Sequence, residues 1–171
     1  MKILVAYSSL TGNTQKVAQA VAAALGEAAD LKTVAEAGDC AGYDKVIVGF
    51  WVDKSTADKA AAELLGKLHG KQVALFTTMG AYPQPPYSDK CLDNAAALVP
   101  ADNKVLAARF ACMGKIDPKL IEMFKKLPAD HPHAMTPERA ARHAEAAKHP
   151  DDADLAAAAE FAKAALAEFN K

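Results

Sequence analysis

The sequence predicts an α/β protein with a doubly wound, five-stranded parallel sheet of order 2-1-3-4-5 and helices on both faces. Short apolar runs alternate with amphipathic helical segments along the 171-residue chain, which is typical of right-handed β-α-β units. The run Ile3–Ala6 is continuously apolar, and Lys45–Trp51 is nearly so, as strands buried on both faces require. A hydroxyl-rich loop, residues 8–14, then joins the first run to a helical segment.

The predicted strands are separated by segments with helical spacing of apolar residues. In chain order these strands are Lys2–Tyr7, Leu31–Ala35, Lys45–Trp51, Gln72–Thr78 and Lys104–Cys112. The second has the weakest pattern and is expected near a sheet edge. In this strand order, ligands bind beyond the carboxyl ends of the first, third and fourth strands.

Each predicted helix has a start or stop signal. The first helix ends at Gly26, the second is capped by Ser55 or Thr56 and stops at Gly70, and the third is capped by Ser88. The fourth runs from Asp117-Pro118 to about Leu127. The fifth starts at Thr136-Pro137, and the last starts near Pro150. We expect residues 1–171 to form a single domain, with a helical insertion at about 128–150 before the last helix.

Bulk composition excludes several classes of protein. A net charge of -1 provides no electrostatic case for nucleic-acid binding, and no apolar run is long enough to span a membrane. The first residues form a strand and lack the pattern of a signal peptide. Three separated cysteines without a C-x-x-C pair fit buried thiols in a reducing cytoplasm, which is the expected location.

The loop between the first strand and the first helix is a candidate phosphate site. Unpaired amides and the helix dipole favour an anion at a helix N-terminus, and hydroxyl and amide side chains of the loop can add neutral hydrogen bonds. Its candidate residues are Ser9, Leu10, Thr11, Gly12, Asn13 and Thr14. The run matches neither G-x-x-x-x-G-K-[ST] nor G-x-G-x-x-G. The alternative is a polar turn in which Asn13 or Thr14 caps the helix.

Two aromatic loops are predicted at the same sheet edge. One contains Phe50, Trp51 and Val52, and the other contains Thr78, Met79, Gly80, Ala81 and Tyr82. Aromatic side chains stack on a flat ring, and loop backbone groups can bond to its polar edge. Taken singly, Phe50 and Trp51 are better interpreted as core residues, and Tyr82 as loop packing. Convergence with a phosphate site favours a flat aromatic ligand that carries a phosphate.

The run Ser9–Thr14 resembles the [ST]-x-T-G-x-T phosphate loop of flavodoxins, at the place where flavodoxins carry it. This resemblance covers the architecture from Met1 to about Lys126. It implies that the second and third loops hold the isoalloxazine ring of FMN, with Trp51 and Tyr82 flanking it. The strings Gly-Phe-Trp-Val-Asp-Lys-x-Thr-Ala-Asp and Gly-Ala-Tyr-Pro resemble the flavodoxin-domain proteins of anaerobic bacteria, including those associated with bilirubin reduction, over nearly the whole chain.

The third loop departs from the flavodoxin pattern G-x-G-D-x-x-Y. Thr77, Met79 and Gly80 replace it, and the acidic residue is missing. Negative charge near a flavin disfavours the anionic hydroquinone, so its loss should raise the potential of that step, with Asp53 compensating in part.

Other candidate groups are weaker. His131-Pro132-His133 could begin a metal site, but no completing ligands stand at fixed spacing, and His143 and His149 are expected in or beside a solvated helix, so no metal is predicted. Cys112 is expected in the core, and Lys115 is a candidate contact for an anion. No catalytic residues are predicted, because a bound cofactor would carry the chemistry.

Three functions remain open at this point. The first is an FMN-binding electron-transfer protein that carries electrons to or within a partner reductase. The second is an FMN-dependent oxidoreductase that acts directly on a quinone or a tetrapyrrole, with the insertion covering the flavin or mediating dimerisation. The third is a flavin-free binding domain that keeps the fold.

Overall fold

A parallel sheet forms the centre of the molecule. The computed structural model describes residues 2–171. Five parallel strands lie in the order β2-β1-β3-β5-β6, namely β2 (Ala29–Thr33), β1 (Ile3–Tyr7), β3 (Lys45–Asp53), β5 (Gln72–Met79) and β6 (Lys104–Met113). The predicted order 2-1-3-4-5 is therefore confirmed, with β5 and β6 as the predicted fourth and fifth strands. A two-residue strand, β4 (Thr56–Ala57), pairs antiparallel with the end of β3 and was not predicted.

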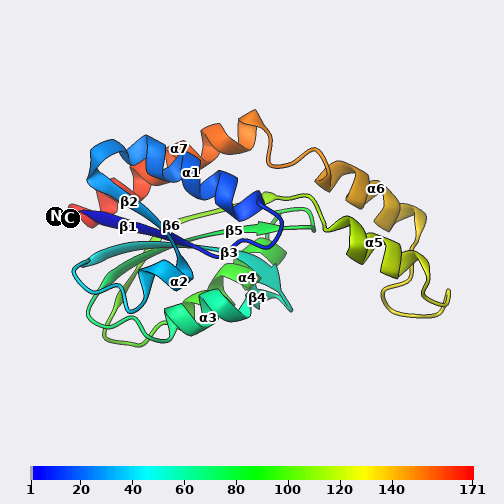
Figure 1. Cartoon of the computed structure of the whole chain (residues 1–171), viewed down its shortest axis with the longest axis horizontal. Helices are drawn as coiled ribbons and strands as arrows, with labels where there is room; N and C mark the ends of the chain where they lie inside the picture. Colours follow the sequence, from blue (N-terminus) through cyan, green and yellow to red (C-terminus); the bar gives the residue numbers. More distant parts are fainter. Residues whose placement is uncertain (1) are drawn as a thin grey trace.

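Helices cover both faces of the sheet (Figure 1). One face carries α1 (Asn13–Leu25), which the short helix η1 (Gly26–Ala28) follows, and α7 (Asp152–Phe169). The other carries α2 (Val34–Ala37), α3 (Lys59–Leu65) and α4 (Tyr87–Ala96). Side chains alternate along each strand, so Ile3 and Val5 join the first core while Leu4 and Ala6 join the second. The central strands β1, β3 and β5 are thus buried on both sides, which explains their nearly continuous apolar sequences, while the edge strands β2 and β6 are partly exposed.

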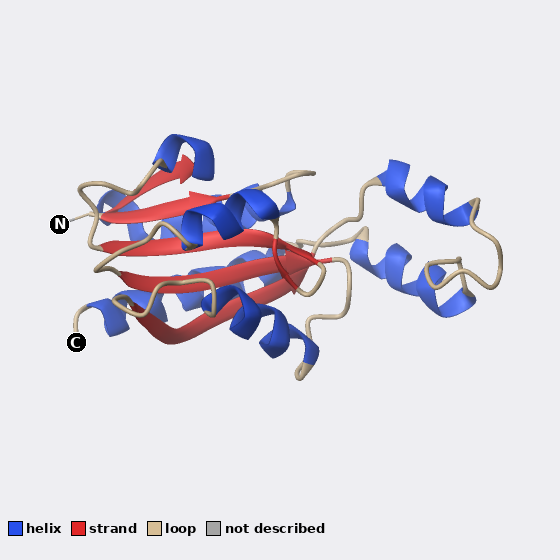
Figure 2. Ribbon diagram, turned by 90° about the horizontal axis from the view of Figure 1, so that it is seen from below, coloured by secondary structure: helices blue, strands red, loops and turns tan. Residues whose placement is uncertain are grey.

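A helical arm leaves the sheet after β6. It consists of α5 (Pro118–Lys125) and α6 (Pro137–Ala146), joined by a loop. Figures 1 and 2 show that these two helices project beyond the carboxyl ends of the strands and do not pack on either face of the sheet. At the base of the arm, the backbone N–H of Lys115 donates to the carbonyl of His149 over 3.0 Å, so the two ends of the arm are neighbours.

Two predicted helix starts, one helix end and one strand end are corrected by the structure. Helix α3 ends at Leu65 with Gly66 as its C-cap, before the predicted stop at Gly70. Asp58, and neither Ser55 nor Thr56, caps α3, because Ser55 lies in the β3–β4 turn and Thr56 is in β4. Helix α4 begins at Tyr87 and Ser88 is its second residue, with no side-chain cap. The second strand ends at Thr33, since Thr33 and Glu36 form a capping box that starts α2. The predicted caps Asp117 and Thr136 are confirmed.

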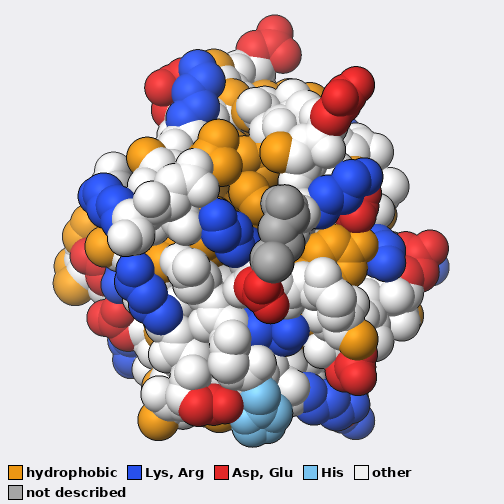
Figure 3. Space-filling view, turned by 90° about the vertical axis from the view of Figure 1, so that its left-hand side faces the viewer, with side chains coloured by type: hydrophobic (Ala, Val, Ile, Leu, Met, Phe, Trp, Pro, Cys, Tyr) orange, Lys and Arg blue, Asp and Glu red, His pale blue; other side chains and the backbone are white. Residues whose placement is uncertain are grey.

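The end of the molecule opposite the arm is where the strands begin. Figure 3 shows Lys, Arg, Asp and Glu side chains scattered across this face, without a large patch of one sign. Lys2, which precedes β1, and Asp30 of the neighbouring strand β2 form an ion pair of 2.9 Å there. Within residues 2–171, no helix has the length and apolar character needed to cross a membrane.

Candidate functional site

The loop after β1 leads into the N-terminus of α1. Gly12 is the N-cap residue and has φ 93°, a left-handed conformation that glycine adopts without strain. Because the N-cap is a glycine, no N-cap side chain accepts a hydrogen bond from a helix amide. The alternative interpretation, in which Asn13 or Thr14 caps the helix, is therefore wrong. Instead, Oγ of Ser9 accepts from the amides of Gly12 (3.2 Å) and Gln15 (3.3 Å). The Ser9 hydroxyl therefore lies at the start of the helix, which is where backbone amides and the helix dipole favour an anion.

Two side chains connect this loop to the ends of other strands. The buried hydroxyl of Thr14 shares a hydrogen bond of 2.9 Å with the hydroxyl of Thr78 at the end of β5. Nδ2 of Asn13 donates to the carbonyl of Lys115 over 2.8 Å, just beyond the end of β6. Thr11, which is exposed, lies 3.5 Å from the same carbonyl. Lys115 thus meets the loop through its backbone.

The second loop is a tight hairpin made by the end of β3 and β4. Val52 pairs with Ala57, and the turn residues Lys54 and Ser55 have positive φ values of 50° and 61°. Trp51 and Val52 are half-buried at this edge. Phe50 is fully buried in the core between the sheet and α3, so its side chain is a core group, and only its backbone lies beside the loop.

The third loop follows β5. Thr78 and Met79 are buried, Gly80 and Ala81 are half-buried, and Tyr82 is 47% exposed. Thr77, which replaces a glycine of the flavodoxin pattern, donates from its hydroxyl to the carbonyl of Phe50 over 3.0 Å. The threonine at this position therefore connects β5 to Phe50, the residue before Trp51.

Two residues of this edge, Ser8 and Asp58, were not predicted as site residues. Oγ of Ser8 donates to Oδ2 of Asp58 over 2.6 Å, and this bond joins the end of β1 to the base of the second loop. A sequence signal existed for Asp58, because an aspartate before Lys59–Leu65 is a favoured helix cap. The bond to Ser8 had no signal, since it joins residues 50 positions apart.

The arm base holds a group of charged side chains. Nδ1 of His149 lies 2.5 Å from Oδ2 of Asp154, and its Nε2 lies 3.1 Å from Oε1 of Glu145. Asp154 and then Glu145 accept from the ring and raise the pKa of His149. Asp151 adds a third carboxylate 3.8 Å from Nδ1, so hydrogen bonds and ion pairs account for the position of the ring.

The remaining histidines and cysteines are mostly packing groups. His143 is 8% exposed, and burial lowers its pKa, so the expectation of a solvated histidine is wrong there. The rings of Phe124 and His143 are stacked with centroids 6.3 Å apart, and His133 stacks on the same phenyl ring at 5.9 Å. The three cysteines are buried, as predicted, and burial raises the pKa of each thiol.

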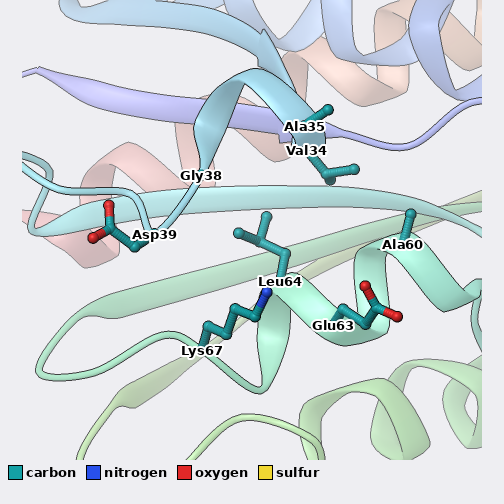
Figure 4. A pocket seen from close by; sticks show the side chains of 8 residues that line it. All are labelled: Val34, Ala35, Gly38, Asp39, Ala60, Glu63, Leu64 and Lys67. Atoms are coloured by element: carbon teal, nitrogen blue, oxygen red, sulfur yellow. The ribbon is translucent and has the colours of Figure 1, made fainter.

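A separate hollow of about 400 Å³ lies between α2 and α3 (Figure 4). Val34 and Leu64 form part of its apolar lining, while Asp39, Glu63 and Lys67 supply charged groups. None of the predicted site residues lines it. The three loops at the carboxyl ends of β1, β3 and β5 therefore remain the candidate site.

Comparison with known proteins agrees with this fold. A family model described as a flavodoxin domain matches residues 4–163. The chain belongs to the flavodoxin family. Two curated relatives are each named flavodoxin-like domain-containing protein BilS. That of Clostridioides difficile (strain CD3) is 38% identical over 170 residues, covering 95% of each chain, and that of Clostridium symbiosum (strain WAL-14163) is 30% identical over 186 residues, covering 94% of each.

Solved flavodoxins share the architecture of this family member. Oxidised flavodoxin 2 from Bacillus cereus aligns over 98% of this chain and 99% of its own, with a TM-score of 0.58 at 18% identity. At that level of identity the similarity concerns the fold, which agrees with the doubly wound sheet described above.

Proposed function

We propose that this protein binds FMN at the carboxyl ends of β1, β3 and β5 and carries electrons to or within a partner reductase. The phosphate is held by the loop Ser9–Thr14, and the ring lies between the second and third loops. The bound flavin supplies the electron-transfer chemistry. The protein binds it, orients it and leaves one edge accessible.

The observation that carries this proposal is the direct bonding between the three loops. Ser8 bonds to Asp58 at the base of the second loop, and Thr14 bonds to Thr78 at the start of the third. A phosphate cradle and two aromatic loops are therefore held at one edge by short hydrogen bonds. Membership of the flavodoxin family supports FMN as the ligand of such an edge.

The ring is expected between Trp51 and Tyr82. Trp51 is half-buried and Tyr82 is 47% exposed, so both have surface available for stacking. The exposed side chain of Leu10 (67%) lies in the phosphate loop itself. Apolar groups exposed around a flavin edge suit transient contact with a redox partner.

The position of the arm favours a carrier over an enclosed enzyme. In Figures 1 and 2 the arm extends away from the sheet, so it does not cover the three loops. An enzyme that reduces a quinone or a tetrapyrrole directly would need a pocket for that substrate beside the flavin. The resemblance to proteins associated with bilirubin reduction makes a tetrapyrrole reductase the first partner class to test.

A ligand pair tests the phosphate site. We expect the purified protein to bind FMN in a one-to-one ratio and to bind riboflavin, which lacks the phosphate, more weakly. In Ser9→Ala the affinity for FMN should fall roughly tenfold, the value of one hydrogen bond to a charged group, while the affinity for riboflavin stays near that of the wild type. Titration followed by quenching of flavin and Trp51 fluorescence measures both.

Three outcomes would contradict the proposal. A protein that fails to bind added FMN would exclude both flavin functions and favour a flavin-free binding domain. Equal losses for FMN and riboflavin in Ser9→Ala would mean that the loop does not hold a phosphate. Rapid oxidation of NAD(P)H with a quinone acceptor, without added reductase, would favour the direct enzyme.

A further inference from the structure

The Asp58 side chain makes more bonds than a helix cap needs. Oδ2 accepts from the hydroxyl of Ser8 (2.6 Å) and the amide of Ala61 (3.3 Å), and Oδ1 accepts from the amide of Trp51 (3.3 Å). The bond to Ala61 is the capping bond of α3. The other two reach the ends of β1 and β3, so the carboxylate joins three elements.

Asp58 holds the backbone of Trp51 on both sides. Its own amide donates to the carbonyl of Trp51 over 3.1 Å, while its carboxylate accepts from the Trp51 amide. Between them, the β3–β4 hairpin brings Val52 opposite Ala57. The position of Trp51 at the sheet edge is therefore determined by the residue that closes the hairpin.

The bond to Ser8 carries this restraint to the phosphate loop. Ser8 precedes Ser9–Thr14 directly, and its amide donates to the carbonyl of Gly49 in β3 over 3.0 Å. At the point where the chain leaves β1 for the phosphate loop, the Ser8 side chain is thus bonded to Asp58 at the base of the loop that contains Trp51. A change at Asp58 would release both loops.

The carboxylate is also buried without a charged partner. Asp58 is 2% exposed, and in the described part of the chain, residues 2–171, no Lys, Arg or His nitrogen lies within 4.0 Å of it. Its three partners, the Ser8 hydroxyl and the amides of Trp51 and Ala61, are all neutral donors. A charge surrounded by protein acts over a longer distance than one in water. Asp58 therefore holds its carboxylate at the ends of β1 and β3, directly beside the backbone of Trp51.

We propose that Asp58 is a positioning residue that sets Trp51 against the phosphate loop and that its buried charge lowers the reduction potential of the bound flavin. The proposal rests on FMN binding at this edge. A negative charge near the ring disfavours the additional negative charge of the anionic hydroquinone. Asp53, which the sequence offered for this role, is exposed at the end of β3 and is screened by water and salt.

The experiment compares Asp58→Asn with Asp53→Asn. Asparagine keeps the shape of Asp58 and, with its carbonyl oxygen toward Ser8 and Ala61, the cap of α3. It removes the charge, and its NH2 group cannot accept from the Trp51 amide as Oδ1 of Asp58 does. We expect the midpoint potential of the bound FMN, measured by spectroelectrochemical titration, to shift to more positive values in Asp58→Asn. The shift in Asp53→Asn should be smaller. An unchanged potential in Asp58→Asn, or an equal shift in both variants, would overturn the charge part of the proposal.

The positioning part is tested without flavin. Trp51 is the single tryptophan of the chain, so fluorescence reports on this residue alone. In Ser8→Ala, which keeps the Asp58 charge and the cap, acrylamide should quench Trp51 more strongly than in the wild type. Unchanged quenching would overturn the positioning role. If the wild type failed to bind FMN, the proposed function would be wrong. The acrylamide quenching of Trp51 would still test the positioning role, because it needs no flavin.

Discussion

Asn13 and Lys115 are 102 positions apart, yet Nδ2 of Asn13 donates to the Lys115 carbonyl over 2.8 Å. The same amide nitrogen also lies 3.0 Å from the hydroxyl oxygen of Thr11. Asn13 thus connects the phosphate loop to the segment from which the arm departs. The bond requires close approach, because a β-carbon at Gly114 would lie 2.6 Å from Nδ2 of Asn13.

Gly114→Ala should therefore weaken FMN binding. The added methyl group pushes the Asn13 side chain away from the Lys115 carbonyl, and the loss of about one hydrogen bond predicts roughly a tenfold rise in the dissociation constant. Gly66→Ala is the matched control, since its β-carbon would meet its nearest neighbour, the Ala62 carbonyl, at 3.6 Å. Equal FMN affinities for the two variants, measured by fluorescence titration, would contradict this role of Asn13.

Thr14→Val should destabilise the protein by about 1 kcal/mol, because it leaves the buried hydroxyl of Thr78 without its partner. Thr11→Val removes an exposed hydroxyl and should leave the free energy of unfolding nearly unchanged. Urea unfolding of Thr14→Val, of Thr78→Val and of the double variant measures the coupling between the two threonines, with Thr11→Val as the control. Strictly additive effects would mean that the two threonines do not interact.

The stability of the arm base should depend on pH through His149. Its pKa is raised above the ordinary 6.5 by Asp154 and Glu145. The folded state therefore binds the proton more tightly, so this stabilisation is complete below about pH 6.5 and is lost as the pH rises through the folded-state pKa. His149→Gln should lower the melting temperature more at pH 6 than at pH 9.

His69→Gln is the control for that experiment. His69 is exposed and lies near Asp102, away from the arm base. Its replacement should leave the difference in melting temperature between the two pH values as it is in the wild type. A His149→Gln variant with the same loss at both pH values would show that the imidazolium contributes nothing specific.

The arm should be removable. Its ends meet at the bond between Lys115 and His149, and no large contact joins α5 or α6 to the sheet in residues 2–171. Replacing residues 117–147 by two glycines should preserve the fold and change FMN affinity less than about twofold, since no loop residue is lost. Circular dichroism and FMN titration measure this. Loss of FMN binding with an intact fold would instead assign the arm to the flavin site.

Local sequence patterns determined most of the architecture. The buried strands, their order and the phosphate loop Ser9–Thr14 could be predicted, because continuous apolar runs and helix-start residues depend on neighbours in the chain. The two-residue strand Thr56–Ala57 could not be predicted, since so short a segment has no periodicity. The expectation of a single domain stays a prediction.

Only the tertiary structure decided how the site is connected. The sequence placed Trp51 and the phosphate loop at one sheet edge, but the bonds Ser8–Asp58 and Thr14–Thr78 depend on packing between distant segments. Phe50 was a candidate at that edge and is a core residue, because the alternation of β3 turns its side chain toward α3. The direction in which the arm leaves the sheet was likewise absent from any local pattern, since the path of the chain after Lys115 is set by contacts with His149 and Asn13.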